Sequence, residues 1–138
     1  MQDGTLHSPG NFEETIILRG DVYAAQCPTR QLLDRVGDKW SVLILTLIGE
    51  KSIRFNELKR NINGISQKML SQTLRSLERD GLVIRTVEQT MPVAVSYGIT
   101  PLGAELLSTL QALINWAETR MNAVSAAQIL YDQRKETD

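Results

Sequence analysis

The sequence has few of the residues that build metal sites, disulfides and catalytic centres. Its 138 residues include one cysteine and one histidine. One cysteine excludes an intramolecular disulfide, and without a second histidine or a cysteine cluster we expect no transition-metal site. The chain also lacks a Gly-rich phosphate loop, a Ser/His/acid set in sensible positions and an HExxH motif. We therefore expect neither an enzyme nor a protein with a cofactor.

Long apolar runs are also missing. None reaches the ~18 residues that a membrane-spanning helix needs, and the longest, residues 42–48, is broken by Thr46. The N-terminus shows no basic region followed by an apolar core, so we expect no secretory signal. Hydrophobic residues make up 42% of the chain and charged residues 22%, which is ordinary for a globular protein. These features predict a one-domain cytoplasmic protein with no membrane partner.

Charge is unevenly spread along the chain. The net charge is −1, which by itself argues weakly against nucleic acid as a partner. The segment from Lys51 to Arg85, however, contains eight cations and three anions, so its net charge is +5 and that of the rest of the chain is −6. Phosphate binding responds to the local patch more than to the sum. A basic middle between acidic ends is typical of a DNA-binding protein whose ends have another role.

Residues 66–79 predict a helix with two unlike faces. Apolar residues recur at three- and four-residue steps and share one side: Ile65, Met69 or Leu70, Leu74 and Leu77. The other side carries short polar groups, amides and cations, with no acid before Glu78, and consists of Ser66, Gln67, Lys68, Ser71, Gln72 and Arg75. Such a face can lie against phosphates and present donors to base edges in a DNA major groove. The alternative is an ordinary amphipathic helix with a solvated face.

The remaining signals predict the order of elements. We expect two helices at residues 28–36 and 39–48, a short strand at 53–55 and a brief helix at 56–60. The polar-faced helix at 66–79 is followed by a hairpin at 82–100 and a long helix at 101–123. This order predicts a mainly α fold with a small β-hairpin, a winged helix-turn-helix. We divide the chain into an N-terminal arm (residues 1–22), the winged domain (residues 23–125) and a tail (residues 126–138). The tail either extends the last helix or frays.

The long last helix has more apolar surface than one small domain normally covers. Its apolar residues form two neighbouring stripes. We therefore expect a homodimer formed through the terminal helices, with an interface that includes Leu107, Leu110, Ile114 and Met121.

Several short motifs occur in a fixed order: Cys27-Pro28, Val36-Gly37-Asp38-Lys39-Trp40, Arg54-Phe55-Asn56-Glu57-Leu58, residues 64–70 (GISQKML), residues 77–83 (LERDGLV) and residues 97–103 (YGITPLG). In these motifs the chain resembles the HxlR-type winged-helix transcription regulators, a MarR-like family, over residues 27 to about 117. The resemblance implies a homodimer that binds a double-stranded operator and controls nearby genes. Some members of the family sense electrophiles, quinones or disulfide stress through a cysteine near the first helix, which here is Cys27.

The long side chains of the polar helix face have expected contacts. Gln67 and Gln72 could pair with adenine edges, and Arg75 could bind guanine or a phosphate. Lys68 is expected to hold a phosphate. Ser66 could also be no more than the cap of its helix.

Two arginines outside this helix complete the expected DNA-binding set. Arg54 could bind a phosphate, with a surface ion pair as the alternative. The family's hairpin tip usually carries a basic residue and an acid, where this chain has Ala94 and Ser96. A tip contact to DNA is therefore in doubt, and Arg85 on the preceding strand is the better candidate for a contact from the wing.

Cys27 precedes Pro28 at a predicted helix start, where the helix dipole and free N–H groups favour a thiolate. Arg30 adds positive charge nearby. We therefore expect a redox- or electrophile-responsive DNA-binding regulator, and the alternative for Cys27 is a buried, inert thiol. Two rival functions remain: a regulator with a small-molecule inducer pocket at the dimer interface, and a winged helix used only for protein contacts.

Overall fold

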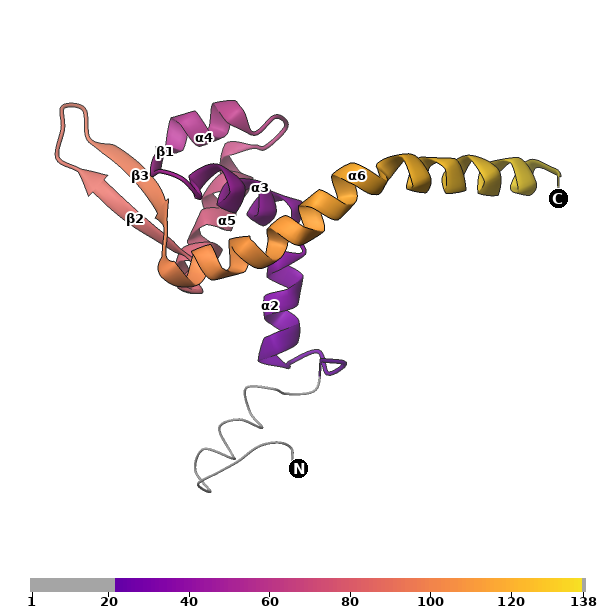
Figure 1. The fold of residues 1–138 in the computed structure, drawn as a ribbon. Helices are drawn as coiled ribbons and strands as arrows, with labels where there is room; N and C mark the ends of the chain where they lie inside the picture. The colour runs from indigo at the N-terminus through magenta and orange to yellow at the C-terminus, as the bar shows by residue number, and fades with distance from the viewer. Residues whose placement is uncertain (1–21, 138) are drawn as a thin grey trace, which may run out of the picture. The chain divides into compact units, whose positions relative to one another are not determined.

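The computed structural model describes residues 22–137 (Figure 1). These residues form two compact units that divide between Leu43 and Ile44. Except for Val22, the predicted N-terminal arm lies outside the described residues. Among the described helices, none combines the length and the apolar character that crossing a bilayer requires.

The first unit contains helix α2 (Pro28–Val36) and the start of α3 (Lys39–Ile48). Cys27 is the N-cap of α2 and Pro28 occupies its first turn, as predicted. Asp38 caps α3, because its carboxylate accepts a hydrogen bond from the Trp40 backbone N–H at 3.3 Å. Helix α2 has no buried residue, and its Leu32 and Leu33 side chains are 45% and 55% exposed.

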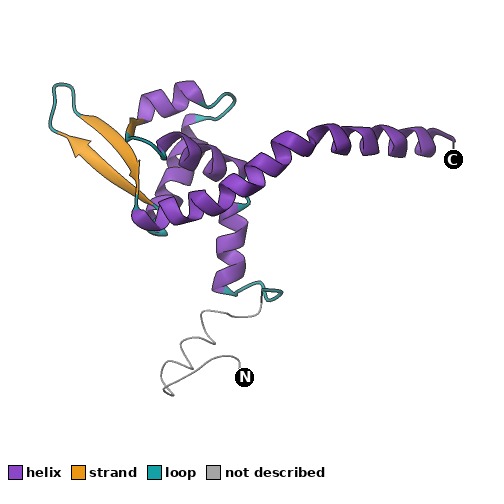
Figure 2. Ribbon diagram, viewed as in Figure 1, coloured by secondary structure: helices purple, strands orange, loops and turns teal. Residues whose placement is uncertain are grey.

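The second unit contains a small sheet and three further helices (Figure 2). The elements after α3 are β1 (Ile53–Arg54), α4 (Phe55–Asn61), α5 (Gln67–Arg79), β2 (Val83–Glu88), β3 (Ala94–Ile99) and α6 (Pro101–Thr137). The antiparallel sheet has the order β1-β3-β2. The predicted two-stranded hairpin is thus part of a three-stranded sheet, because β1 pairs with β3 and brings Ile53 opposite Tyr97.

Helix α5 packs its apolar face into the core of this unit. Leu70 is fully buried while Met69 is 38% exposed, which decides between the two residues that the periodicity allowed. The fully buried apolar side chains of the unit are Ile44, Leu45, Ile48, Leu58, Leu70, Leu74 and Leu77.

Gly81 ends α5 and turns the chain into the hairpin. It has φ +78°, a left-handed conformation that glycine adopts without steric cost. The Gly81 N–H donates to the Glu78 carbonyl at 3.0 Å and the Leu82 N–H donates to the Leu77 carbonyl at 3.0 Å. This pair of hydrogen bonds is a Schellman motif, which satisfies carbonyls left free at the helix end. Strand β2 therefore leaves α5 in one defined direction.

Helix α6 starts at a capped and tightly packed site. The Thr100 hydroxyl donates to the Gly81 carbonyl at 2.6 Å and accepts from the Gly103 N–H at 3.0 Å. A Cβ on Gly103 would lie 2.2 Å from the Leu82 carbonyl oxygen, so the close approach of α6 to β2 requires glycine. The helix continues to Thr137, so residues 126–137 extend it rather than fray.

Candidate nucleic-acid interface

Helix α5 exposes the polar face that the sequence predicts. Gln67, Lys68, Gln72 and Arg75 are exposed, and Ser71 is half-buried. Ser66 is the N-cap, with its hydroxyl accepting from the Met69 N–H at 3.0 Å, so its cap role is established. The face thus presents amides and cations from successive turns to one side of the helix.

The wing brings a second cation to this face. An open hollow of about 420 Å³ is lined by Ser71, Arg75 and Glu78 of α5 together with Arg85 and Tyr97 of the sheet. Arg85 lies directly opposite Tyr97 in the β2–β3 register, so both side chains project from the same face of the sheet. Within residues 22–137, no hydrogen-bond acceptor or ion-pair partner engages Arg75 or Arg85. Both guanidinium groups are therefore available to external phosphates.

Arg79 extends the same surface by one turn. It lines a shallow hollow of about 400 Å³ with Gln72, Arg75 and Ser76. Arg79 contributes to the positive charge of residues 51–85 but was not predicted as a site residue. Its spacing from Gln72 and Arg75, seven and four residues, is the signal that could have found it.

Arg54 lies on the opposite face of the sheet. It pairs in register with Ser96, the neighbour of Tyr97 along β3, so its side chain points away from the Arg85 side. Its guanidinium donates to the Glu88 carboxylate at 2.8 Å. The alternative considered for Arg54, a surface ion pair, is therefore what the structure contains. A phosphate contact by Arg54 stays a prediction that requires this pair to open.

The ion pair between Arg54 and Glu88 shifts the pKa of both side chains. The hydrogen bond from Arg54 holds the pKa of Glu88 below its ordinary value of 4.5, with a smaller contribution from Ser96. The same hydrogen bond raises the pKa of Arg54. Sequence reasoning missed Glu88, since the three-strand register that brings it within reach of β1 has no local signal.

Cys27 belongs to the first unit and is 6% exposed. Its backbone N–H donates to the Ala24 carbonyl at 3.1 Å, and its carbonyl accepts from the Gln31 N–H at 3.0 Å. Its helix N-cap position is as predicted, whereas its burial is the property expected of the inert alternative.

Two of the four residues predicted at the dimer interface lie in the core of their own unit. Leu107 and Leu110 are 8% and 6% exposed. A Cβ on Gly49, just after α3, would lie 2.5 Å from a Leu107 methyl carbon, so Leu107 packs against the end of α3. Part of the wide apolar surface of α6 is thus covered within the chain. Ile114 is half-buried and Met121 is 50% exposed, so these two could contact a partner.

The described residues contain no group of three or more histidine, cysteine, aspartate or glutamate side chains that could hold a metal ion. The surface formed by α5 and Arg85 carries amides, hydroxyls and guanidinium groups, and Glu78 is the acid among the residues that line its hollow.

Comparison with known proteins identifies this architecture. The sequence model of HxlR-like helix-turn-helix proteins matches residues 35–125. The chain belongs to this family. The HTH-type transcriptional regulator YtfH of Escherichia coli K12 is 40% identical over 109 residues, covering 79% of this chain and 86% of that protein.

Solved structures of transcriptional regulators, including members of the MarR family, share the fold. The transcriptional regulator YtfH from Salmonella typhimurium superimposes with a TM-score of 0.74 at 38% identity, over 79% of this chain and 97% of that one. The redox regulator HypR in its reduced form gives a TM-score of 0.66 at 32% identity, over 72% and 98%. These relatives confirm the predicted winged helix-turn-helix and its assignment to DNA-binding transcriptional regulation, not enzymatic activity.

Proposed function

We propose that this HxlR-like protein is a cytoplasmic, homodimeric regulator that binds a specific operator through α5, with Arg85 holding the adjacent phosphate backbone. The observation that carries the proposal is the hollow between α5 and the wing. There, Arg75 and Arg85 from separate elements lie on one side and have no acceptor among the described residues. A major groove admits one helix, and phosphates flank it on both sides.

The residues of this surface divide into two roles. Gln67, Gln72 and Arg75 select bases, since amides match adenine and guanidinium matches guanine. Lys68 and Arg85 bind phosphates, which contributes affinity without sequence preference.

Salt-dependent binding tests this division. The probe is the genomic duplex recovered with the protein from its own genome, titrated at several salt concentrations. Lys68→Ala and Arg85→Ala should each weaken binding and reduce the slope of log affinity against log salt by ~1. Lys135→Ala, in the last turn of α6, is the matched control and should leave the slope unchanged.

If both variants bind with wild-type affinity and slope, the DNA-binding face lies elsewhere. A protein that retains no duplex at low salt would favour the rival function, a winged helix used for protein contacts.

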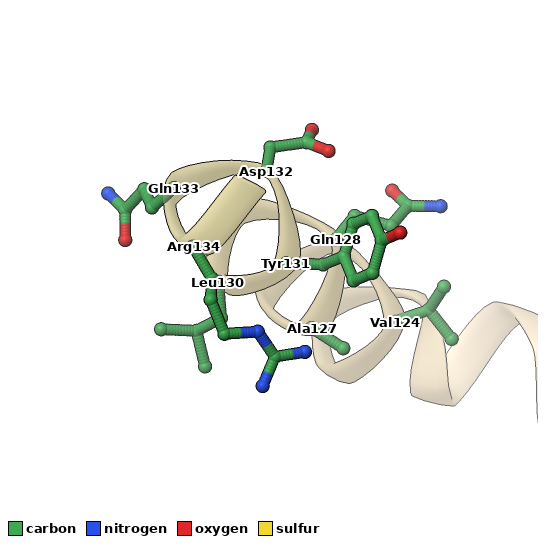
Figure 3. A pocket seen from close by; sticks show the side chains of 8 residues that line it. All are labelled: Val124, Ala127, Gln128, Leu130, Tyr131, Asp132, Gln133 and Arg134. Carbon is green, nitrogen blue, oxygen red and sulfur yellow. The ribbon is translucent and has the colours of Figure 1, made fainter. Parts of the chain in front are cut away.

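Homodimerisation is supported by exposed apolar surface on α6. Leu113, Trp116 and Tyr131 are 58%, 57% and 57% exposed and fall on one stripe of the helix with Val124 and Ala127. The same surface continues at the end of α6, where Val124, Ala127, Leu130 and Tyr131 border open space beside this one helix. Figure 3 shows the side chains of Val124, Ala127, Leu130 and Tyr131 projecting from α6. A second copy would cover this surface and place two α5 helices on half-sites ~34 Å apart.

We further propose that the regulator responds to oxidants or electrophiles through Cys27. Sensing at this position is supported by the N-cap position of Cys27 and by the similarity to the redox regulator HypR. The burial of Cys27 supports the alternative, an inert thiol in a regulator whose inducer binds at the dimer interface. Oxidation of Cys27 would therefore require the first turn of α2 to open.

A further inference from the structure

Tyr97 is the buried residue of the hollow between α5 and the wing. This hollow of about 420 Å³ is lined by five residues: Ser71, Arg75, Glu78, Arg85 and Tyr97. The first four are exposed or half-buried, whereas Tyr97 is 8% exposed. Tyr97 lies on the central strand of the sheet, opposite Arg85 of β2 and Ile53 of β1. Its ring is therefore held between two neighbouring strands before any ligand binds.

The hydroxyl of Tyr97 lacks a hydrogen-bond partner within residues 22–137. Among the same residues, the fully buried side-chain oxygen without a partner is Ser41 Oγ, not the Tyr97 hydroxyl. The hydroxyl thus stays open to solvent at the end of a buried ring. Because a tyrosine hydroxyl at the edge of a buried site normally has a partner, this group is available to an external acceptor.

The charge of the hollow suits one phosphate of the DNA backbone. Arg75, Arg85 and Glu78 together give it a net charge of +1, and each backbone phosphate carries a single negative charge. Glu78 has no ion pair within residues 22–137, so its carboxylate would repel a second phosphate in the same hollow. Tyrosine hydroxyls are among the groups that bind backbone phosphates in protein–DNA complexes.

We infer that Tyr97 is a DNA-binding residue whose hydroxyl donates a hydrogen bond to the backbone phosphate that Arg85 binds. This inference rests on the proposed function of α5 and Arg85. Arg85 is exposed, so its long side chain loses rotamer freedom on binding, whereas the Tyr97 ring is already held by packing. The hydroxyl therefore fixes the position of the phosphate along the wing, and with it the register of α5 against the bases.

Duplexes with one neutralised backbone phosphate test the inference with the full chain. Each probe is the genomic duplex of the proposed function with one phosphate replaced by a methylphosphonate, so that a methyl group takes the place of a charged oxygen. Neutralising the phosphate that Arg85 binds should cost Arg85→Ala much less affinity than it costs the wild type, which identifies that phosphate. Tyr97→Phe keeps the ring and removes the hydroxyl, and it should lose its sensitivity at the same position.

Affinities on two of these duplexes sharpen the test. On the unmodified duplex, Tyr97→Phe should bind about tenfold more weakly than the wild type, because a hydrogen bond to a charged acceptor is lost. On the duplex neutralised at the Arg85 phosphate, the two proteins should agree within about twofold. The salt slope of Tyr97→Phe should equal that of the wild type, since the hydroxyl carries no charge.

Tyr23→Phe is the matched control for these measurements. It removes the same phenol hydroxyl from a residue of the first unit that does not line the hollow. This variant should bind both duplexes with wild-type affinity.

Two results would overturn the role of Tyr97 and leave operator binding intact. One is a Tyr97→Phe protein that keeps wild-type affinity or is weakened by the same factor on every duplex, as a purely structural residue would be. The other is a loss that depends on a phosphate different from that of Arg85. That result would assign the hydroxyl to the hollow of about 740 Å³ that Tyr97 also borders, together with Arg54 and Arg60. A wild-type protein that binds no duplex would overturn the proposed function as well.

Discussion

At the scale of single residues, ion pairing distinguishes the arginines that are proposed to bind DNA. Arg54 donates to Glu88 at 2.8 Å, whereas Arg75 and Arg85 have no acceptor among the described residues. The pKa of Glu88 is lowered, so the pair stabilises the fold at neutral pH and is lost only as pH falls below 4.5 through the folded-state pKa. At neutral pH the Glu88 carboxylate therefore competes with phosphate for Arg54.

Glu88→Gln should release Arg54. We expect tighter duplex binding and a salt slope that is steeper by ~1, since one more cation becomes available to a phosphate. Salt-dependent titration of the variant measures both quantities. The double variant Arg54→Ala/Glu88→Gln is the control for the general loss of negative charge. If the double variant keeps the whole gain, Arg54 is not the group that was released.

At the scale of secondary-structure elements, α6 has two different parts. Near its start, Leu107 and Leu110 are buried in the core of the second unit. Farther along, Leu113, Trp116 and Tyr131 expose more than half of their side chains. The boundary between core and exposed apolar surface thus lies within one continuous helix, and the exposed part is the surface proposed for a second copy.

Charged substitutions on the exposed stripe should weaken the dimer. Trp116→Glu and Tyr131→Glu should each raise the dissociation constant at least about tenfold, because an unpaired charge would be buried against the partner. Sedimentation equilibrium at micromolar concentration measures this effect. Gln111→Glu, on the opposite side of α6, is the matched control. Leu107→Glu is unsuitable, because it would place a charge in the core of the unit itself.

If the wild-type chain sediments as a monomer, or if both stripe variants associate like the wild type, the second copy does not cover this stripe.

At the scale of the whole molecule, the proposed sensor and the proposed DNA-binding surface belong to different units, with Cys27 in the first and α5 in the second. Because the chain has one cysteine, a disulfide at Cys27 would join it to a small thiol or to Cys27 of a second copy, and an electrophile would instead leave an adduct. Each of these products would alter the N-terminus of α2 and, in a dimer, the spacing of the two α5 helices.

Diamide should lower operator affinity in the wild type and not in Cys27→Ser. In this reaction two thiols lose two electrons and two protons to diamide and form one disulfide. Gel-shift titration before and after treatment measures the change, and reduction with excess thiol should restore binding. If both proteins respond alike, or neither responds, Cys27 is not the sensor and an inducer at the dimer interface becomes the better explanation.

Local sequence signals determined most elements of this protein. The Cys27-Pro28 start of α2, the Ser66 cap and the Gly81 end of α5 were predictable, because helix caps, proline and left-handed glycine act within a few residues. The polar face of α5 was also predictable, since helical periodicity alone places its residues on one side.

Tertiary structure decided everything that depends on contacts between distant segments. The pairing of β1 with β3 placed Arg54 on one face of the sheet and Arg85 on the other, and it brought Glu88 to Arg54 across 34 residues. The end of α3 covered Leu107, so only part of the apolar surface of α6 stayed exposed. The sequence shows which side chains are apolar, and periodicity shows which of them share a helix face. Only the packing in the fold shows whether other parts of the same chain already cover that face.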